Sequence, residues 1–222
     1  MTTAARICLG LSAIGLAVVP QLIVGAPLEQ EMGLVQKIFY FHVPSAWLMF
    51  LSAFVSAGGA IWYLAKRSPT GDAVAAAAAE LAVVFGICVL VTGPMWARKA
   101  WGVWWQWDVR LTTSLLLWLV FVGAVLVRRY GGPGSERLFA VLTVLGAADV
   151  PLIYISVSIW RTIHPKTSVV STLDPGMRPA FFTALATFTL LFVPLFLSRL
   201  RLEMQRARVA ALAARLDDLE DA

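Results

Sequence analysis

Charged residues are scarce in this chain of 222 residues, where Asp, Glu, Lys and Arg together account for only 14% of the sequence. In a soluble globular domain, about a quarter of the residues are charged. Apolar residues account for 59% of the chain, against about half in soluble domains. This balance excludes an ordinary soluble enzyme and indicates an integral membrane protein.

Cysteine and histidine are also scarce, with two of each in the whole chain. Cys8 and Cys88 lie inside apolar runs and form no CxxC pair, which excludes a dithiol or zinc framework. The sequence contains neither a CxxCH motif nor a P-loop, which excludes covalent haem attachment to this chain and ATP hydrolysis by it. The net charge of +5 lies in short hinges and in the C-terminal tail, which argues against a nucleic-acid partner.

Long apolar runs are what the sequence has in place of charge. Each of six runs is 17 to 23 residues long, which is the length range of a helix that spans a bilayer. A membrane barrel would instead show alternating segments of about ten residues. We therefore predict an all-α integral membrane protein with six transmembrane helices. The runs cover residues 7–24, 44–65, 73–95, 111–127, 138–159 and 180–197.

The first run has the basic start and apolar body of a signal peptide, but its length favours an uncleaved helix. Positive charge then predicts the orientation. Hinges on the side of the termini hold 6 Lys and Arg in 23 residues, and the tail after residue 197 adds 5. The other hinges hold 7 in 54 residues. Because cytoplasmic loops are enriched in Lys and Arg, we expect both termini to be cytoplasmic and three periplasmic loops to form one face of an inner-membrane protein.

We expect two segments, a six-helix membrane domain at residues 1–198 and a cytoplasmic tail at residues 199–222. The membrane domain includes a tryptophan-rich periplasmic loop at residues 96–110. In the tail, Val209, Leu212, Leu216 and Leu219 follow the 3-4-3 spacing of an amphipathic helix. Such a helix either lies on the membrane surface or docks a cytoplasmic partner, and the sequence leaves both open.

Tryptophan is concentrated in one hinge, where five of the nine tryptophans fall within twelve residues, 96–107. A single tryptophan at a helix end serves as an interfacial anchor. Interfacial anchoring does not explain why four tryptophans occur within the seven residues from Trp101 to Trp107. A cluster of large flat rings is better suited to cover a large, flat, apolar ligand.

His42 precedes the second predicted helix, and His164 follows the fifth. Six crossings place the hinges after helices 1, 3 and 5 on one side, so both histidines share a face with the tryptophan cluster. Two neutral imidazoles can bind haem iron from opposite sides. Cations in or next to the same hinges are candidates to pair with carboxylates such as the haem propionates. These cations are Arg98, Lys99, Arg110, Arg161 and Lys166.

Residues 101–108 read Trp-Gly-Val-Trp-Trp-Gln-Trp-Asp and are followed by Val-Arg-Leu-Thr-Thr-Ser. This run resembles the WWD signature of a tryptophan-rich family of haem-handling proteins. Within that family, the size, the six spans and the flanking histidines look most like the cytochrome c maturation haem protein C (CcmC) branch. Residues 151–165 are similar to the stretch before that branch's second histidine. The chain departs from the pattern at Pro165, where a polar residue is expected, and at Trp160, where a tryptophan pair is common.

The resemblance implies a haem-binding and transfer protein rather than an enzyme. It implies that non-covalent haem b is held at the periplasmic surface with His42 and His164 as axial ligands of the iron. Delivery would be to a periplasmic haem chaperone during cytochrome c maturation. The other implied partners are the lipid bilayer, subunits of an ABC transporter and a small single-helix membrane protein. The implied haem platform consists of Trp101, Gly102, Trp104, Trp105, Trp107 and Asp108.

Two other functions stay open at this point. A cytochrome b-type electron-transfer subunit would also need two histidines, but at mid-helix positions on facing helices. A permease for haem or another small molecule would need polar groups near the membrane midplane, for which Asp149 and Glu80 are candidates. We expect Asp108 to organise its loop, by bonding the loop backbone or by pairing with Arg98 or Arg110, because an unpaired buried acid is costly.

Overall fold

The computed structural model describes residues 3–162, 164–165 and 170–220. Within these residues, six α-helices are long and apolar enough to cross a membrane, which confirms the predicted all-α fold with six spans. A short 3₁₀ helix, η1 (Leu34–Ile38), precedes the second of them. The α-helices are α1 (Thr3–Gly25), α2 (Phe39–Lys66), α3 (Pro69–Trp101), α4 (Val109–Tyr130), α5 (Ser135–Ile159) and α6 (Arg178–Glu220).

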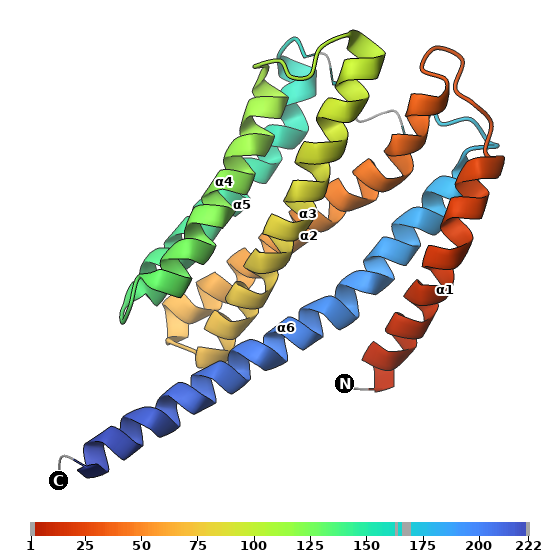
Figure 1. The fold of residues 1–222 in the computed structure, drawn as a ribbon. Coiled ribbons are helices and arrows are strands. Elements are labelled where there is room, and N and C mark those ends of the chain that lie inside the picture. Colours follow the sequence, from red (N-terminus) through yellow and green to blue (C-terminus); the bar gives the residue numbers. More distant parts are fainter. Residues whose placement is uncertain (1–2, 163, 166–169, 221–222) are drawn as a thin grey trace.

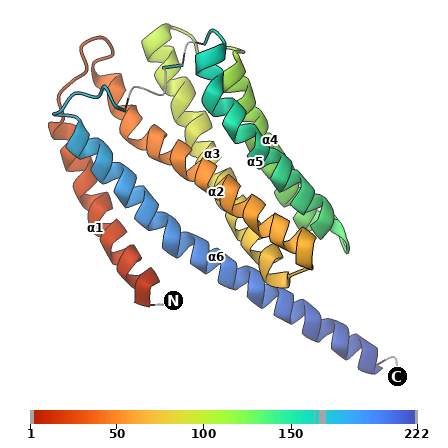
Figure 2. The ribbon, with the colours of Figure 1, turned by 180° about the vertical axis from the view of Figure 1, so that it is seen from behind.

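The helices form two groups that lie side by side (Figures 1 and 2). In the larger group, α2 packs against α3 and α5, and α4 packs against α3 and α5. In the smaller group, α1 packs against α6, which in turn contacts α2 and α3. The long helix α6 therefore connects α1 to the rest of the bundle.

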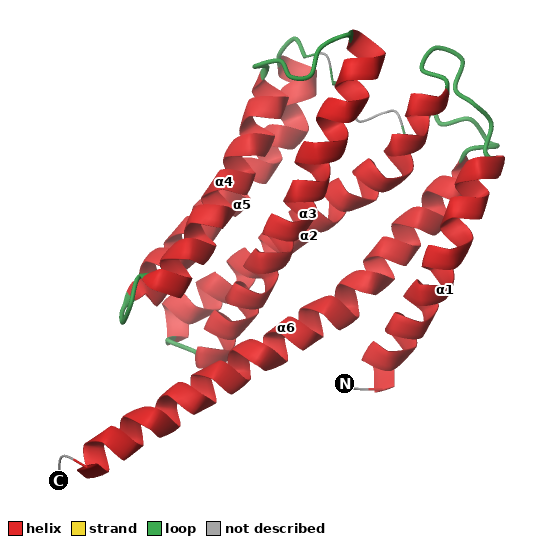
Figure 3. Ribbon diagram, viewed as in Figure 1, coloured by secondary structure: helices red, strands yellow, loops and turns green. Residues whose placement is uncertain are grey.

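The three connections that were predicted to carry the functional residues lie at one end of the bundle. Figure 3 shows the α1–α2, α3–α4 and α5–α6 connections together at the top. The chain termini and the other two connections lie at the opposite end. This arrangement is the one that six crossings require. The assignment of the two ends to periplasm and cytoplasm stays a prediction.

Local sequence signals explain how the chain passes from α3 to α4 at this end. Gly102 has a φ of 78° and ends α3 in the left-handed conformation that suits glycine. Asp108 is the N-cap of α4, where its Oδ1 accepts a hydrogen bond from the backbone N–H of Leu111 at 2.8 Å. The irregular part of the tryptophan-rich segment is therefore confined to residues 102–108.

Two helices extend further toward this end than their apolar runs predict. Helix α2 begins at Phe39 because Phe39 and the next residue, Tyr40, are only 2% and 1% exposed and continue its buried face. Helix α3 continues through Pro94 as far as Trp101. Consequently His42 lies in the first turn of α2, and residues 96–101 belong to α3 rather than to a loop.

Small residues allow α2 and α3 to pack closely. A Cβ atom on Gly59 would lie 2.6 Å from the backbone nitrogen of Ala75, so this approach requires glycine. Beside it, the hydroxyl of Ser56 donates a hydrogen bond to the carbonyl of Ala75 at 2.9 Å. Contacts between small residues are a usual basis for helix association in membranes. This packing fixes the helix that carries His42 against the helix that carries Trp96.

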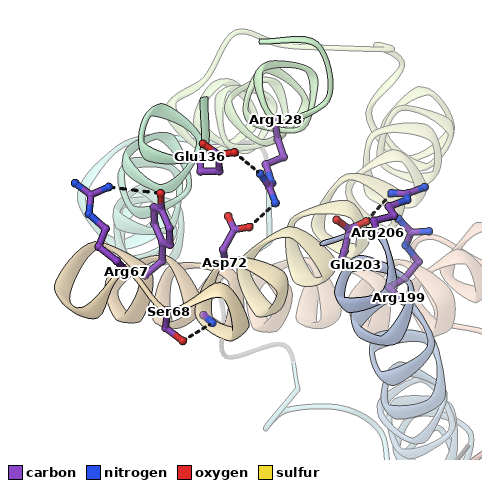
Figure 4. Close-up of polar contacts among 10 residues, drawn as sticks. Arg67, Ser68, Asp72, Arg128, Glu136, Arg199, Glu203 and Arg206 are labelled. Carbon is purple, nitrogen blue, oxygen red and sulfur yellow. Dashed lines mark hydrogen bonds and ion pairs between the residues drawn. The ribbon is translucent and has the colours of Figure 1, made fainter. Parts of the chain in front are cut away.

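Ion pairs join the helices at the end of the bundle that holds the termini (Figure 4). Arg128 on α4 pairs with Asp72 on α3 and, at 3.4 Å, with Glu136 on α5. Arg199 on α6 pairs with Glu80 on α3. Glu80, one of the two acids considered for a permease path, therefore has an ion-pair partner that ties α3 to α6.

Helix α6 is 43 residues long and runs without a break past residue 198. The apolar stripe of its last turns is exposed to solvent. The stripe consists of Val209, Leu212, Leu216 and Leu219. The C-terminal segment thus continues the direction of the last span, and the division into a membrane domain and a separate tail stays a prediction.

Candidate functional site

A cavity of about 70 Å³ lies between α2, α3, α4 and α5, at the end of the bundle where the three predicted loops meet. Part of its wall is apolar and includes Met49, Val89 and Ile153. The aromatic and basic part of its lining consists of His42, Phe50, Trp96, Trp101, Trp105, Arg110 and His164. The structure therefore brings both histidines to one cavity with part of the tryptophan cluster.

His42 is only 7% exposed, and its ring donates a hydrogen bond to a neighbouring helix. Its Nδ1 lies 2.8 Å from Oγ1 of Thr92 on α3. That hydroxyl donates its single hydrogen to the carbonyl of Cys88 at 2.6 Å, so it accepts from His42. Nδ1 of His42 therefore carries the hydrogen, and Nε2 carries the free lone pair.

His164 reaches the same tautomer by a different contact. Its Nδ1 lies 2.9 Å from the carbonyl oxygen of Pro165, and because a carbonyl only accepts, Nδ1 donates. Loss of solvent around the ring and the positive charge of Arg110 together lower the pKa of His164 to about 3. The ring is therefore neutral at physiological pH, and its Nε2 can act as a Lewis base.

Three of the tryptophans form aromatic walls of the cavity. Trp96 is 4% exposed, and its ring centroid lies 6.3 Å from that of His42 and 5.7 Å from that of Trp101. Its indole N–H donates to the sulfur of Met32 at 3.2 Å. Nε1 of Trp105 is buried and has no hydrogen-bond partner within the described part of the chain. This unsatisfied donor at the cavity is available to a polar group of a ligand.

The rest of the predicted platform lies outside the cavity lining. Trp104 and Trp107 are 61% and 75% exposed. Trp107 packs edge-on against Trp105, with ring centroids 5.8 Å apart. Gly102 serves as the C-cap of α3. The rings of Trp96, Trp101 and Trp105 thus line the cavity, whereas those of Trp104 and Trp107 are exposed.

Asp108 connects the tryptophan segment to the segment that bears His164. Its Oδ1 caps α4, and its Oδ2 accepts a short hydrogen bond from the hydroxyl of Thr162. The same hydroxyl oxygen accepts a hydrogen bond from the backbone N–H of His164 at 3.1 Å. This geometry suits the predicted organising role of Asp108, which itself stays a prediction.

Of the five cations predicted to meet a ligand, Arg110 lines the cavity. Its guanidinium also donates to the carbonyl of Ile153 at 3.4 Å, which ties α4 to α5. Arg98 donates to the carbonyl of Gly102 at the end of α3. Arg98, Lys99 and Arg161 are exposed. Lys166 lies outside the described residues.

Three contributors to the site were absent from the predicted set of site residues. Trp96 belongs to the tryptophan run, and a helix continuing past Pro94 would have placed it between one and two turns from Trp101. Thr92 and Thr162 act through contacts across 50 and 54 residues of sequence. Nothing in the local pattern around a threonine signals such a contact, so these two were not accessible to sequence reasoning.

The donor set fits a porphyrin better than a bare ion. Among the described residues, no group of three or more His, Cys, Asp or Glu side chains could hold a metal ion. A metal bound by His42 and His164 therefore needs a ligand that fills its remaining positions, as a porphyrin does when imidazoles are axial. The cavity volume of about 70 Å³ is below the roughly 300–1,000 Å³ of pockets that bury an organic ligand. A porphyrin thus fits only if surrounding segments move or one edge stays outside.

Comparison with known proteins gives consistent matches over most of the chain. The family described as heme exporter protein C matches residues 1–215. Heme exporter protein C of Bradyrhizobium diazoefficiens is 39% identical over 197 residues, which cover 84% of this chain and 73% of that protein. The corresponding protein of Escherichia coli K12 is 34% identical over 184 residues, covering 79% and 73%. That of Paracoccus denitrificans is 35% identical over 204 residues, covering 85% and 81%.

Proposed function

We propose that this chain, which belongs to the heme exporter protein C family, binds haem between His42 and His164 and passes it on during cytochrome c maturation. The family membership confirms the resemblance predicted from the tryptophan run. It supports a role in haem handling for cytochrome c biogenesis by a multi-pass membrane protein rather than a conventional enzyme. The particular site, the form of haem and its destination are our proposal.

The observation that carries the proposal is that both histidines of the chain line one cavity in the same tautomer. Each ring uses Nδ1 as a donor to the protein and keeps the Nε2 lone pair. Metal-bound histidines are ordinarily held in this way, since a second hydrogen bond fixes the ring and its tautomer. Both rings could therefore bind a metal in the cavity without a change of tautomer.

Haem b bound without a covalent link would supply an iron with two axial positions for these nitrogens. Trp96, Trp101 and Trp105 cover apolar surface, and Nε1 of Trp105 offers a donor. Arg110, a cation in the lining, would pair with a propionate. Gly102 and Asp108 shape the turn between them. The outward rings of Trp104 and Trp107 then lie on the surface that a receiving protein approaches.

Transfer requires that the cargo be reachable from outside the bundle. The cavity lies at the end where the three longer connections meet, beside the exposed tryptophans. We place this end in the periplasm and the termini in the cytoplasm, in the inner membrane of a bacterium. The recipient is a periplasmic haem chaperone, with ABC transporter subunits and a small single-helix protein as membrane partners. The similarity to heme exporter proteins supports an ABC-type export system as the setting.

The absorption spectrum of the purified protein tests this function. His42→Ala and His164→Ala should each lower the amount of haem that co-purifies and shift the spectrum away from that of two axial imidazoles. Trp47→Ala is the matched control, because Trp47 lies on the same helix as His42 and is 47% exposed. Unchanged haem content and spectrum in both histidine variants would remove these residues as ligands.

The positions of the polar groups do not favour the two alternatives. His42 lies in the first turn of α2 and His164 in a connection, whereas an electron-transfer cytochrome b holds haem between mid-helix histidines. Glu80 is engaged with Arg199. Asp149 on α5 has a buried carboxylate oxygen without a partner in the described residues, but a single acid defines no path across the bundle.

A further inference from the structure

We infer that Thr92 is a positioning residue that sets the orientation of the His42 ring and thereby the direction of its metal-binding nitrogen. The inference rests on the proposed function, because the orientation of Nε2 matters only if His42 is a ligand. Thr92 lies on α3, outside the tryptophan signature and on a different helix from the histidine. It acts through His42 rather than on the ligand itself.

The direction of the two hydrogen bonds at Thr92 follows from the chemistry of a hydroxyl group. The oxygen has one hydrogen and two lone pairs. The carbonyl of Cys88, at 2.6 Å, can only accept and therefore takes that hydrogen. The contact to Nδ1 of His42 at 2.8 Å must then be donated by the imidazole. A threonine or serine hydroxyl in this place thus selects the tautomer with a free Nε2.

The surroundings of the ring restrict its rotation further. A Cβ atom on Gly93 would lie 3.4 Å from Cε1 of His42, an ordinary van der Waals distance, so the imidazole lies beside α3 at this position. Trp96, one turn further along the same helix, stands at a steep angle to the ring, with centroids 6.3 Å apart. The His42 side chain of α2 therefore lies against a surface of α3 that is formed by Thr92, Gly93 and Trp96. Within this surface, the Thr92 hydroxyl is the group that selects between the two ring nitrogens.

A merely structural role for Thr92 makes different predictions. Threonine hydroxyls in helices often bond the carbonyl four residues earlier without further function, and Thr92 does this with Cys88. Thr189 on α6 makes the same type of bond, to the carbonyl of Leu185 at 2.7 Å, and does not line the cavity. Thr189→Val therefore removes a hydroxyl of the same kind from a membrane helix without touching a histidine. It is the matched control for Thr92→Val.

The experiment compares Thr92→Val, Thr92→Ser and Thr189→Val in the full-length protein, purified with and without haem. Without haem, ¹⁵N spectra of labelled histidine report which nitrogen of each ring carries the hydrogen. We expect the His42 signal of Thr92→Val to change to a mixture of tautomers. Thr92→Ser and Thr189→Val should keep hydrogen on Nδ1. If Thr92→Val does not accumulate, Thr92→Ala is judged by the same criteria.

With haem, loss of a hydrogen bond that orients a ligand weakens metal binding by about 10–100-fold. We expect a loss of this size in the haem affinity of Thr92→Val, with a spectrum that free imidazole restores. Thr92→Ser and Thr189→Val should stay close to the parent protein. A Thr92→Val protein with unchanged His42 tautomer, haem affinity and spectrum would overturn the inference. If His42→Ala also leaves the spectrum unchanged, the proposed function itself is wrong, so the two failures are distinguishable.

Discussion

Replacing Trp105 by alanine tests whether the cavity-lining rings, rather than the whole tryptophan cluster, contact the ligand. Trp105 lines the cavity, whereas the adjacent Trp104 is 61% exposed and lies outside the lining. The two variants thus remove the same side chain from neighbouring positions of one turn. Only the first is expected to expose ligand surface.

The expected loss can be worked out from the area that one ring covers. A tryptophan buries about 150–250 Å², and roughly a third of it is available to a ligand on one face. At about 25 cal/mol per Å², this contact contributes about 1.3–2.1 kcal/mol. The corresponding loss of haem affinity for Trp105→Ala is roughly tenfold to thirtyfold. For Trp104→Ala we expect a change of less than about threefold on the same scale.

Haem titration of the purified haem-free variants, followed by absorption, measures both affinities. The thermal stability of each variant is recorded alongside, so that a general loss of folding is recognised. Equal losses in the two variants would show that position in the cavity is irrelevant, and the cluster would then act as an interfacial anchor. A larger loss for Trp104→Ala would place the ligand on the outer face of the turn.

Three further predictions concern the helix cap at Asp108, the protonation of His164 and the orientation of the chain in the membrane. Asp108→Ala should lower haem retention and reduce stability by about 1 kcal/mol through the lost helix cap. In the same binding and melting assays Asp108→Asn, which keeps an acceptor, should lose less. Folding lowers the pKa of the His164 ring from 6.5 to about 3. As the pH falls, this ring is therefore protonated in the unfolded chain at a higher pH than in the folded protein. The haem-free protein should therefore lose stability as the pH falls below about 6.5. Its melting temperature should drop between pH 7 and pH 5, and less so in His164→Gln; parallel drops would contradict this assignment. Finally, a cysteine at the exposed position of Arg161, in a chain with Cys8 and Cys88 replaced, should react with an impermeant reagent from the periplasmic side. Protection there would reverse the predicted topology.

The overall fold was predictable because membrane spans leave a strong signal. Each span is an unbroken apolar run, and the parity of six crossings brings His42, His164 and the tryptophans to one end of the bundle. Neither conclusion requires knowledge of side-chain contacts. The positions of helix ends were less predictable, since α2 and α3 continue beyond their most apolar parts. As a result His42 and Trp96 lie on helices rather than in loops.

The division of the tryptophan cluster could not be predicted from its composition. Trp104 and Trp105 are adjacent and chemically identical, and only the path of the chain after Gly102 turns one inward and the other outward. Likewise, Arg110 faces the cavity because it belongs to the first turn of α4, whereas Arg98 and Arg161 are exposed. Such choices depend on tertiary geometry, which a single sequence does not reveal.

The continuity of α6 has a mechanical consequence. From Arg199 to Glu220 the helix extends about 30 Å beyond the ion pair with Glu80, at 1.5 Å per residue. A tilt of about 5° around that contact would displace the tip by about 3 Å. The same helix begins beside the connection that bears His164, and Arg199 lies at its midpoint. A displacement of the end near the cavity is therefore carried to the far end of α6 in the opposite direction and with about the same amplitude.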